Sequence, residues 1–273
     1  MARAPLKLFW YRKVRNFGDA ISQRIAEFVS GRPVVWASRS EAELFGLGSL
    51  MEMVAQGHRT PREDGTKPWV WGTGCMTRRV PPFLDNVRIA LLRGPITAEI
   101  LGLDAGAFGD PGLLIADVLT KRPECDGRIG IVPHLSKIAD PAWTDLVAED
   151  RRLRLIDVTQ PDPLGAVRQI ASCAHVISSS LHGLITADAF GIPNTWLDPA
   201  HNHAAPQLKF RDYARSVGRR FFDPLDRRDI LAHIDRGLPD DIPYMDGIEA
   251  SKLCLLNSFP AELKAGTTLK GAA

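Results

Sequence analysis

The chain has 273 residues, of which 45% are hydrophobic and 24% are charged, and its formal net charge is +2. This length is enough for one large domain or two small ones, and the composition is that of an ordinary globular protein. The small net charge argues against a nucleic acid as the partner. Four widely spaced cysteines without a C-x-x-C pair argue against a disulfide framework and a cysteine metal site.

The sequence predicts a cytoplasmic protein. It has no run of the roughly 20 apolar residues that a membrane-spanning helix needs. Residues 6–11 are too short and too mixed to be the apolar core of a secretory signal. We therefore expect reduced cysteines, and any membrane contact to be peripheral, at the inner face of the plasma membrane.

The first part of the chain predicts five β-strands. These short, β-prone segments are residues 6–12, 34–37, 43–45, 69–72 and 87–92. A polar turn at 15–19 precedes an amphipathic helix over residues 20–29, which Gly31 ends. Pro95 begins a second helix, and the turn at 108–112 leads into a third.

Residues 120–127 are rich in charge, proline and glycine and indicate a linker, after which the alternation of strands and helices resumes. Four more strands are expected at residues 128–132, 153–158, 175–178 and 194–197. Such alternation is typical of parallel, doubly wound sheets. Because it occurs twice, we expect an α/β fold of two Rossmann-like lobes with an active-site cleft between them. The expected units are residues 1–122, 123–245 and a C-terminal tail, 246–273, that crosses back to the first lobe.

Polar motifs follow several of these strands. They are Asn16–Asp19, Gly46–Ser49, Arg93-Gly94 and Ser178–Gly183. Ligands of open α/β folds bind at the carboxyl ends of strands, so we expect the motifs to face one cleft. The last motif joins a strand to a helix N-terminus, where free amides and the helix dipole attract anions. Its candidate anion ligands are Ser179, Ser180, Leu181 and Gly183.

Each candidate side chain also has a structural interpretation. His182 suits a general acid or base, or else a capping or core histidine. Arg93 suits phosphate or carboxylate recognition at the cleft mouth, or else a surface ion pair. Asn16 and Asp19 suit a turn and helix cap, whereas Asp19 also suits a base, and Ser180 suits an N-cap.

The remaining candidates carry weaker signals. Gly48 and Ser49 permit close approach of the backbone to a ligand, but the turn is not a full G-x-G-x-x-G motif. Lys209 and Arg211 belong to a basic segment that suits either a solvated helix face or an anionic donor. The loop histidines at 134, 201 and 203 have no companions at metal-ligand spacing, so no metal is expected.

Over residues 6–200 the sequence resembles the polysaccharide pyruvyl transferase family. The matching motifs, in chain order, are Asn16-Phe17-Gly18-Asp19, the Gly-rich turn that ends in Ser49-Leu50, Arg93-Gly94-Pro95, Gly109-Asp110-Pro111, and Ser178-Ser179-Ser180-Leu181-His182-Gly183 with Ala189-Phe190-Gly191-Ile192-Pro193. Residues 209–213 also resemble members that act on bacterial exopolysaccharides.

The resemblance implies transfer of pyruvate from phosphoenolpyruvate to two hydroxyls of a sugar, which forms a ketal. The acceptor would be a bacterial exopolysaccharide or its lipid-linked repeat unit. The implied fold is similar to that of two-lobed GT-B glycosyltransferases, and phosphoenolpyruvate is the donor substrate with no further cofactor. His182 is implied as the catalytic residue and Arg93 as a donor ligand. We expect His182 to donate the proton to the methylene carbon or to assist the departure of phosphate, and Asp19 is a weaker candidate for the base.

The sequence departs from the family pattern at two positions. Many members carry an arginine where this chain has Ser180, and Lys209 or Arg211 is expected to supply that charge. Leu47 replaces a common glycine, so closer approach of the backbone is expected to be restricted there. Two other functions therefore stay open: a GT-B glycosyltransferase that uses a nucleotide sugar, and a non-catalytic glycan-binding subunit.

Overall fold

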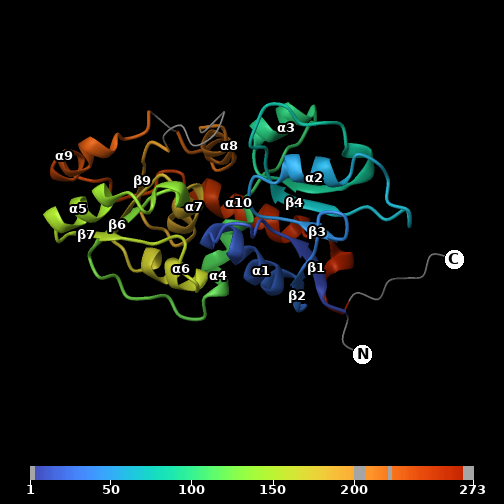
Figure 1. Cartoon of the computed structure of the whole chain (residues 1–273), viewed down its shortest axis with the longest axis horizontal. Coiled ribbons are helices and arrows are strands. Elements are labelled where there is room, and N and C mark those ends of the chain that lie inside the picture. The colour runs from blue at the N-terminus through green and yellow to red at the C-terminus, as the bar shows by residue number, and fades with distance from the viewer. Residues whose placement is uncertain (1–3, 200–206, 221–222, 267–273) are drawn as a thin grey trace.

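The computed structural model describes residues 4–199, 207–220 and 223–266, which contain two parallel β-sheets (Figure 1). Sheet A has the strand order β2-β1-β3-β4-β5, from β1 (Leu6–Phe9), β2 (Val34–Trp36), β3 (Leu44–Phe45), β4 (Trp69–Thr73) and β5 (Arg88–Leu92). Sheet B has the order β7-β6-β8-β9, from β6 (Ile129–Val132), β7 (Leu153–Leu155), β8 (His175–Ser178) and β9 (Asn194–Trp196). The predicted α/β class with two parallel sheets is confirmed.

Strand register brings the functional loops of sheet B to one edge. Every residue of β6 and β8 is buried, as expected for strands covered on both faces. Ile129 pairs with His175 and Val132 pairs with Ser178, so both strands end at the same level. The residues that follow Val132 and Ser178 therefore emerge side by side.

Ten α-helices lie within the described residues. They are α1 (Phe17–Ser30), α2 (Met51–Gly57), α3 (Pro95–Leu101), α4 (Ile115–Val118), α5 (Pro141–Glu149), α6 (Pro163–Ala171), α7 (Leu181–Ala189), α8 (Leu208–Ser216), α9 (Ile230–Asp235) and α10 (Met245–Ser258). Short 3₁₀ turns stand at Leu84–Asn86 (η1), Pro111–Leu114 (η2), Leu135–Lys137 (η3), Arg227–Asp229 (η4) and Ala261–Leu263 (η5). None of the described helices has the length and apolarity to cross a membrane.

The first helix begins earlier than predicted. Asn16 is its N-cap, in an extended conformation, and its side chain accepts a hydrogen bond from the Gly18 amide at 3.3 Å. Asp19 therefore lies in the first turn of α1, where a negative charge is favourable, and not in a turn before the helix. Helix α2 was not predicted because no side chain caps it at Leu50. The helix expected to reach Leu119 is the η2 turn followed by the single turn of α4.

The two sheets share one hydrophobic interior. The largest core cluster contains Leu6 and Leu44 of sheet A together with Val132 and Val176 of sheet B. Helix α1 contacts α6, and the Phe17 amide donates to the Val158 carbonyl at 2.8 Å. The start of α1 is thereby fixed against the loop that follows β7.

Two helices that follow sheet B in the chain pack against sheet A. Helix α8 contacts α3, and α10 crosses β4 and β5 near the middle of the molecule (Figure 1). The Trp71 indole donates to the Leu255 carbonyl at 3.0 Å, and Arg32 donates to the Leu263 carbonyl at 3.2 Å. Sheet A is therefore completed by residues that come last in the sequence.

Candidate functional site

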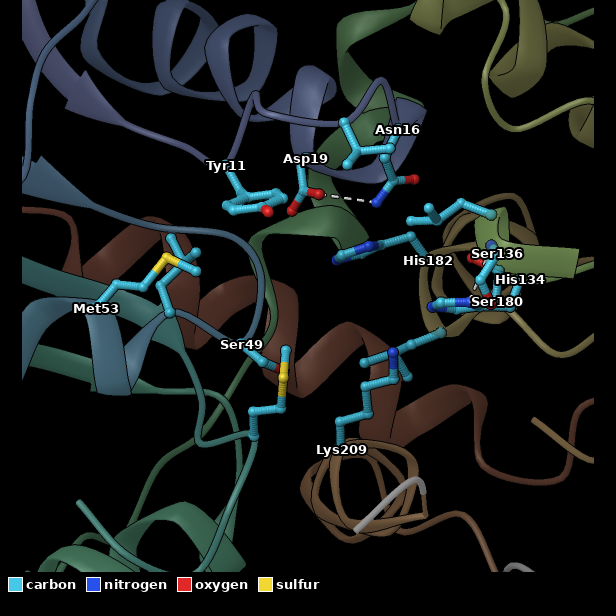
Figure 2. Close-up of a pocket in the computed structure, with 15 residues that line it drawn as sticks. Tyr11, Asn16, Asp19, Ser49, Met53, His134, Ser136, Ser180, His182 and Lys209 are labelled. Atoms are coloured by element: carbon cyan, nitrogen blue, oxygen red, sulfur yellow. Dashed lines mark hydrogen bonds between the residues drawn. The ribbon is translucent and has the colours of Figure 1, made fainter. Parts of the chain in front are cut away.

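Loops from both sheets surround a pocket of about 380 Å³, called here the central pocket (Figure 2). The loops and helix starts that follow β1, β3 and β4 contribute Tyr11, Asn16, Asp19, Ser49, Met53 and Met76 among others. The loops and helix starts that follow β6 and β8 contribute His134, Ser136, Ser180, Leu181 and His182, and α8 contributes Lys209. These are the carboxyl ends of parallel strands, where such folds bind ligands.

The N-terminus of α7 supplies the pocket with anion-binding groups. Ser180 occupies the N-cap position, but its hydroxyl makes no capping bond and lines the pocket. The amides of Leu181 and His182 lie in the first turn of α7, where no carbonyl of the same helix is in position to accept their hydrogen bonds. Gly183 lies behind the pocket, where a Cβ would stand 2.3 Å from Ser178 Oγ. The glycine therefore allows α7 to start directly against β8.

His182 lies across the middle of the pocket, with Asp19 and Asn16 on one side and Lys209 on the other (Figure 2). The side chain is 8% exposed, and its Nε2 atom is buried with no hydrogen-bond partner among the described residues. Burial, with smaller contributions from Lys209 and Arg93, lowers the pKa of His182 to about 3. The imidazole is therefore neutral at pH 7.

Asp19 and Lys209 carry the perturbed charges of the pocket. Burial raises the pKa of Asp19 to about 6, against the hydrogen bond from Asn16 Nδ2 at 2.8 Å and the charge of Lys209. Burial and the nearby Arg93 lower the pKa of Lys209 to about 8, against the charge of Asp19. Perturbed titratable groups gathered in one cavity are typical of functional sites.

Arg93 is not at the cleft mouth, where the sequence placed it, and it is not a surface residue. Its side chain is wholly buried and pairs with the equally buried Asp212, Nε to Oδ2, at 2.9 Å. It also donates to the Cys75 carbonyl at 3.0 Å and to Ser49 Oγ at 2.6 Å. Because Ser49 lines the central pocket, Arg93 contacts the pocket through that hydroxyl, and its charge acts on His182 and Lys209.

Other predicted residues lie beside the pocket without lining it. Ser179 Oγ accepts a hydrogen bond from the His134 amide at 2.9 Å and so ties together the loops after β6 and β8. Gly48, with φ of 110°, brings its loop against Asp19. Arg211 turns away and donates to Gln207 at 3.0 Å. Leu47 is buried in the core, so it does not restrict the pocket as the sequence suggested.

Several pocket residues were not among the site residues expected from the sequence. His134 was noted only as a loop histidine, yet its ring, bonded to Ser136 at 2.9 Å, lines the pocket. Tyr11, Met53 and Met76 belong to no motif, and only their positions after strands could have indicated them. No group of three potential metal ligands occurs in the described parts of the chain, and His201 and His203 lie outside them.

The fold and pocket define an α/β protein with a polar pocket at the strand ends. A family model described as polysaccharide pyruvyl transferase matches residues 82–201. An uncharacterized protein, L143, of Acanthamoeba polyphaga mimivirus is 36% identical over 226 residues, which are 79% of this chain and 76% of the relative. The succinoglycan biosynthesis protein ExoV of Rhizobium meliloti is 26% identical over 219 residues, 77% of this chain.

The chain therefore belongs to the polysaccharide pyruvyl transferase family. It spans 64% of the length of ExoV. A crystal structure of a functionally uncharacterized protein from Klebsiella pneumoniae aligns with 80% of this chain and 93% of its own, at 13% identity and a TM-score of 0.44.

Proposed function

We propose that the chain is a ketal pyruvyltransferase that uses phosphoenolpyruvate. Its acceptor is a saccharide of a bacterial exopolysaccharide, carried on a lipid-linked repeat unit. Membership of the family supports this class of reaction. The observation that carries the proposal is the buried His182 Nε2 without a partner, in a pocket that also holds Lys209 and the start of α7. A buried polar atom left unpaired costs about 1–3 kcal/mol, so a ligand that reaches this atom gains by pairing with it.

The donor fits the groups around the central pocket. Phosphoenolpyruvate carries a phosphate and a carboxylate, which need cationic and N–H donors. Lys209 supplies a positive charge, and the Ser180 hydroxyl and the first amides of α7 supply hydrogen bonds. Lys209 thus takes the part of the arginine that many relatives carry at the position of Ser180. Arg93 contributes indirectly by orienting Ser49.

The proposed reaction balances as follows. A proton adds to the methylene carbon of phosphoenolpyruvate, which becomes a methyl group, and carbon 2 becomes electrophilic. One acceptor hydroxyl attacks carbon 2, and a second hydroxyl then closes the ketal as the C–O bond to phosphate breaks. Of the two hydroxyl protons released, one replaces the proton given to the methylene carbon and the other leaves with phosphate.

The pKa directions favour distinct tasks for the two titratable groups. Asp19, with a pKa raised to about 6, is suited to give the proton to the methylene carbon. His182, with a pKa lowered by burial, is suited to accept the proton of the attacking hydroxyl. This assignment is the opposite of the one expected from the sequence. The negative charges of a bound donor raise the pKa of both groups, which brings the pKa of His182 closer to 7.

Two finer features complete the proposal. We infer a GT-B-like arrangement in which the donor and acceptor meet between sheets A and B, because loops of both sheets line the central pocket. We also place the reaction in the cytoplasm, with peripheral contact at the inner membrane face, because a lipid-linked acceptor is anchored there.

The test measures phosphate release and product mass with phosphoenolpyruvate and candidate lipid-linked or free oligosaccharides. The product gains the mass of one pyruvate less one water. We expect His182→Ala to lose at least about a hundredfold in kcat, the contribution of a positioned acid–base group. His175→Ala is the matched control, because His175 is also buried with a pKa lowered by burial but does not line the pocket.

Three outcomes would contradict the proposal. One is release of a nucleotide from a sugar nucleotide in place of phosphate from phosphoenolpyruvate, which would indicate a glycosyltransferase. Another is glycan binding with no turnover, which would indicate a non-catalytic subunit. The last is equal activity of the His182 and His175 variants.

A further inference from the structure

A second pocket, of about 640 Å³, adjoins the central pocket and is called here the side pocket. The lining of both pockets includes Tyr11, Ser49, Met53 and Met76, so the two pockets are direct neighbours that share these residues. Figure 2 shows Tyr11 and Met53 on the same side of the central pocket, away from His134. A molecule in the side pocket would therefore reach toward Ser49 and the anion site.

The side pocket has two tryptophans in its lining that the central pocket lacks. They are Trp10 and Trp36, which are only partly buried, as is Tyr11, which lines both pockets. The Trp36 indole is held by a hydrogen bond from Nε1 to the Trp10 carbonyl at 3.0 Å. The guanidinium of the exposed Arg12 lies over the Trp36 ring, 3.5 Å from its centre, and covers one face of it, so a sugar stacks on the other face of the ring or on the flat guanidinium itself. Rigid rings with a polar edge suit the C–H faces and hydroxyls of sugars.

The rest of the side pocket's lining includes polar side chains but no free acid. Glu52 accepts hydrogen bonds from the amides of Met76 and Thr77, at 3.0 and 2.7 Å, and from the Thr77 hydroxyl at 3.0 Å. Its carboxylate therefore fixes the loop after β4 and is not poised for chemistry. The exposed Arg39 and Gln56 bond to each other at the rim, at 2.5 Å.

The geometry points to the side pocket as the binding site for the acceptor saccharide. The smaller central pocket holds His182, Asp19 and Lys209 and suits the small anionic donor, whereas the larger side pocket offers flat rings and hydrogen-bonding side chains, and its one carboxylate, Glu52, is already bonded. A sugar stacked on Trp36 places its chain along the walls shared by the two pockets, with its reacting hydroxyls toward Ser49. This inference rests on the proposed function and assigns its acceptor side.

The experiment measures the binding of each substrate class separately. Fluorescently labelled protein is applied to an array of neutral and acidic bacterial oligosaccharides, and phosphoenolpyruvate binding is measured by calorimetry. Trp36→Leu is expected to weaken oligosaccharide binding at least about tenfold, because it removes the stacking ring, and to leave phosphoenolpyruvate affinity unchanged. Trp69→Leu is the matched control, since Trp69 is also a half-buried residue of sheet A with an arginine over its ring, Arg88, but lines neither pocket.

A second variant covers the case in which Trp36→Leu fails to fold. Arg39→Ala with Gln56→Ala removes the bonded pair from the exposed rim and is expected to weaken oligosaccharide binding severalfold without loss of stability. The inference is overturned if wild-type protein binds no oligosaccharide, if the Trp36 and Trp69 variants bind equally, or if Trp36→Leu weakens both substrates alike. Failure of the proposed function would look different, because wild-type protein would then not bind phosphoenolpyruvate.

Discussion

Asp212 is the residue whose removal we expect to cost the most stability per atom deleted. Its Oδ2 accepts from Arg93 Nε at 2.9 Å and from the Thr97 hydroxyl at 2.7 Å, and its Oδ1 accepts from the Thr97 amide at 2.9 Å. Both side chains of the Arg93–Asp212 ion pair are fully buried. The pair also joins α8, which carries Lys209, to the start of α3.

The change Asp212→Ala leaves the Arg93 guanidinium buried without its counterion. Breaking a buried ion pair in this way costs about 3–5 kcal/mol. For a chain of this size, each kcal/mol shifts Tm by about 2–4 °C, so we expect Tm to fall by roughly 6–20 °C. The loss arises mainly from the unpaired charge, and replacing both partners by apolar residues, as in Arg93→Met with Asp212→Leu, should therefore recover part of it.

The assay is thermal denaturation followed by circular dichroism, with Asp226→Ala as the control. Asp226 also pairs with an arginine, Arg228, at 2.8 Å, but that pair is exposed to solvent, so its loss should shift Tm far less. The reasoning is refuted if the Asp212 and Asp226 variants lose equal stability. It is refuted equally if the double variant is no more stable than Asp212→Ala.

Three further predictions concern the pocket itself. Gly18→Ala should reduce activity at least about tenfold, because its Cβ would stand 2.2 Å from His182 Nδ1. Helix content measured by circular dichroism should be preserved, because alanine favours a helix. Unchanged activity would contradict this contact. Asp19 has a folded pKa raised from 3.8 to about 6, so its contribution to stability is present below pH 4 and lost as pH rises through 6. In urea titrations, Asp19→Asn should thus be more stable than wild type at pH 8 but not at pH 4, and an equal difference at both would rule this out. Lys209→Met should weaken phosphoenolpyruvate binding at least about tenfold by calorimetry, because it removes the cation of α8 from the pocket; equal affinity would exclude Lys209 as a donor ligand.

The strands were the most predictable part of the fold. Most of the parallel strands are short, mainly apolar segments bounded by turn residues, and all nine described strands fall within or overlap a predicted segment. The start of α1 was misplaced because Asn16–Asp19 suits both a turn and a helix cap, and the sequence alone does not show which of these residues caps the helix. Helix α2 has no capping side chain, so nothing in the sequence marked its beginning.

The site was predictable only where one motif supplies both position and chemistry. Ser178–Gly183 does so, because a strand end and a helix start adjoin within it. Arg93 was misplaced because its partner, Asp212, lies 119 residues further along the chain. The sequence alone could not show which of Lys209 and Arg211 enters the pocket. The rotation of α8 about its axis decides this, because it directs Lys209 into the pocket and Arg211 away from it.

The late position of α10 has a consequence for how the protein is made. Between Leu92, the last residue of β5, and Met245, the first residue of α10, the ribosome adds 153 residues. At about 5–20 residues per second, this takes roughly 8–30 seconds. During that interval the Trp71 indole has no Leu255 carbonyl to bond. The nascent sheet A therefore lacks α10 until all the strands of sheet B have been synthesised, so the half of the molecule that is synthesised first is the last to be completed.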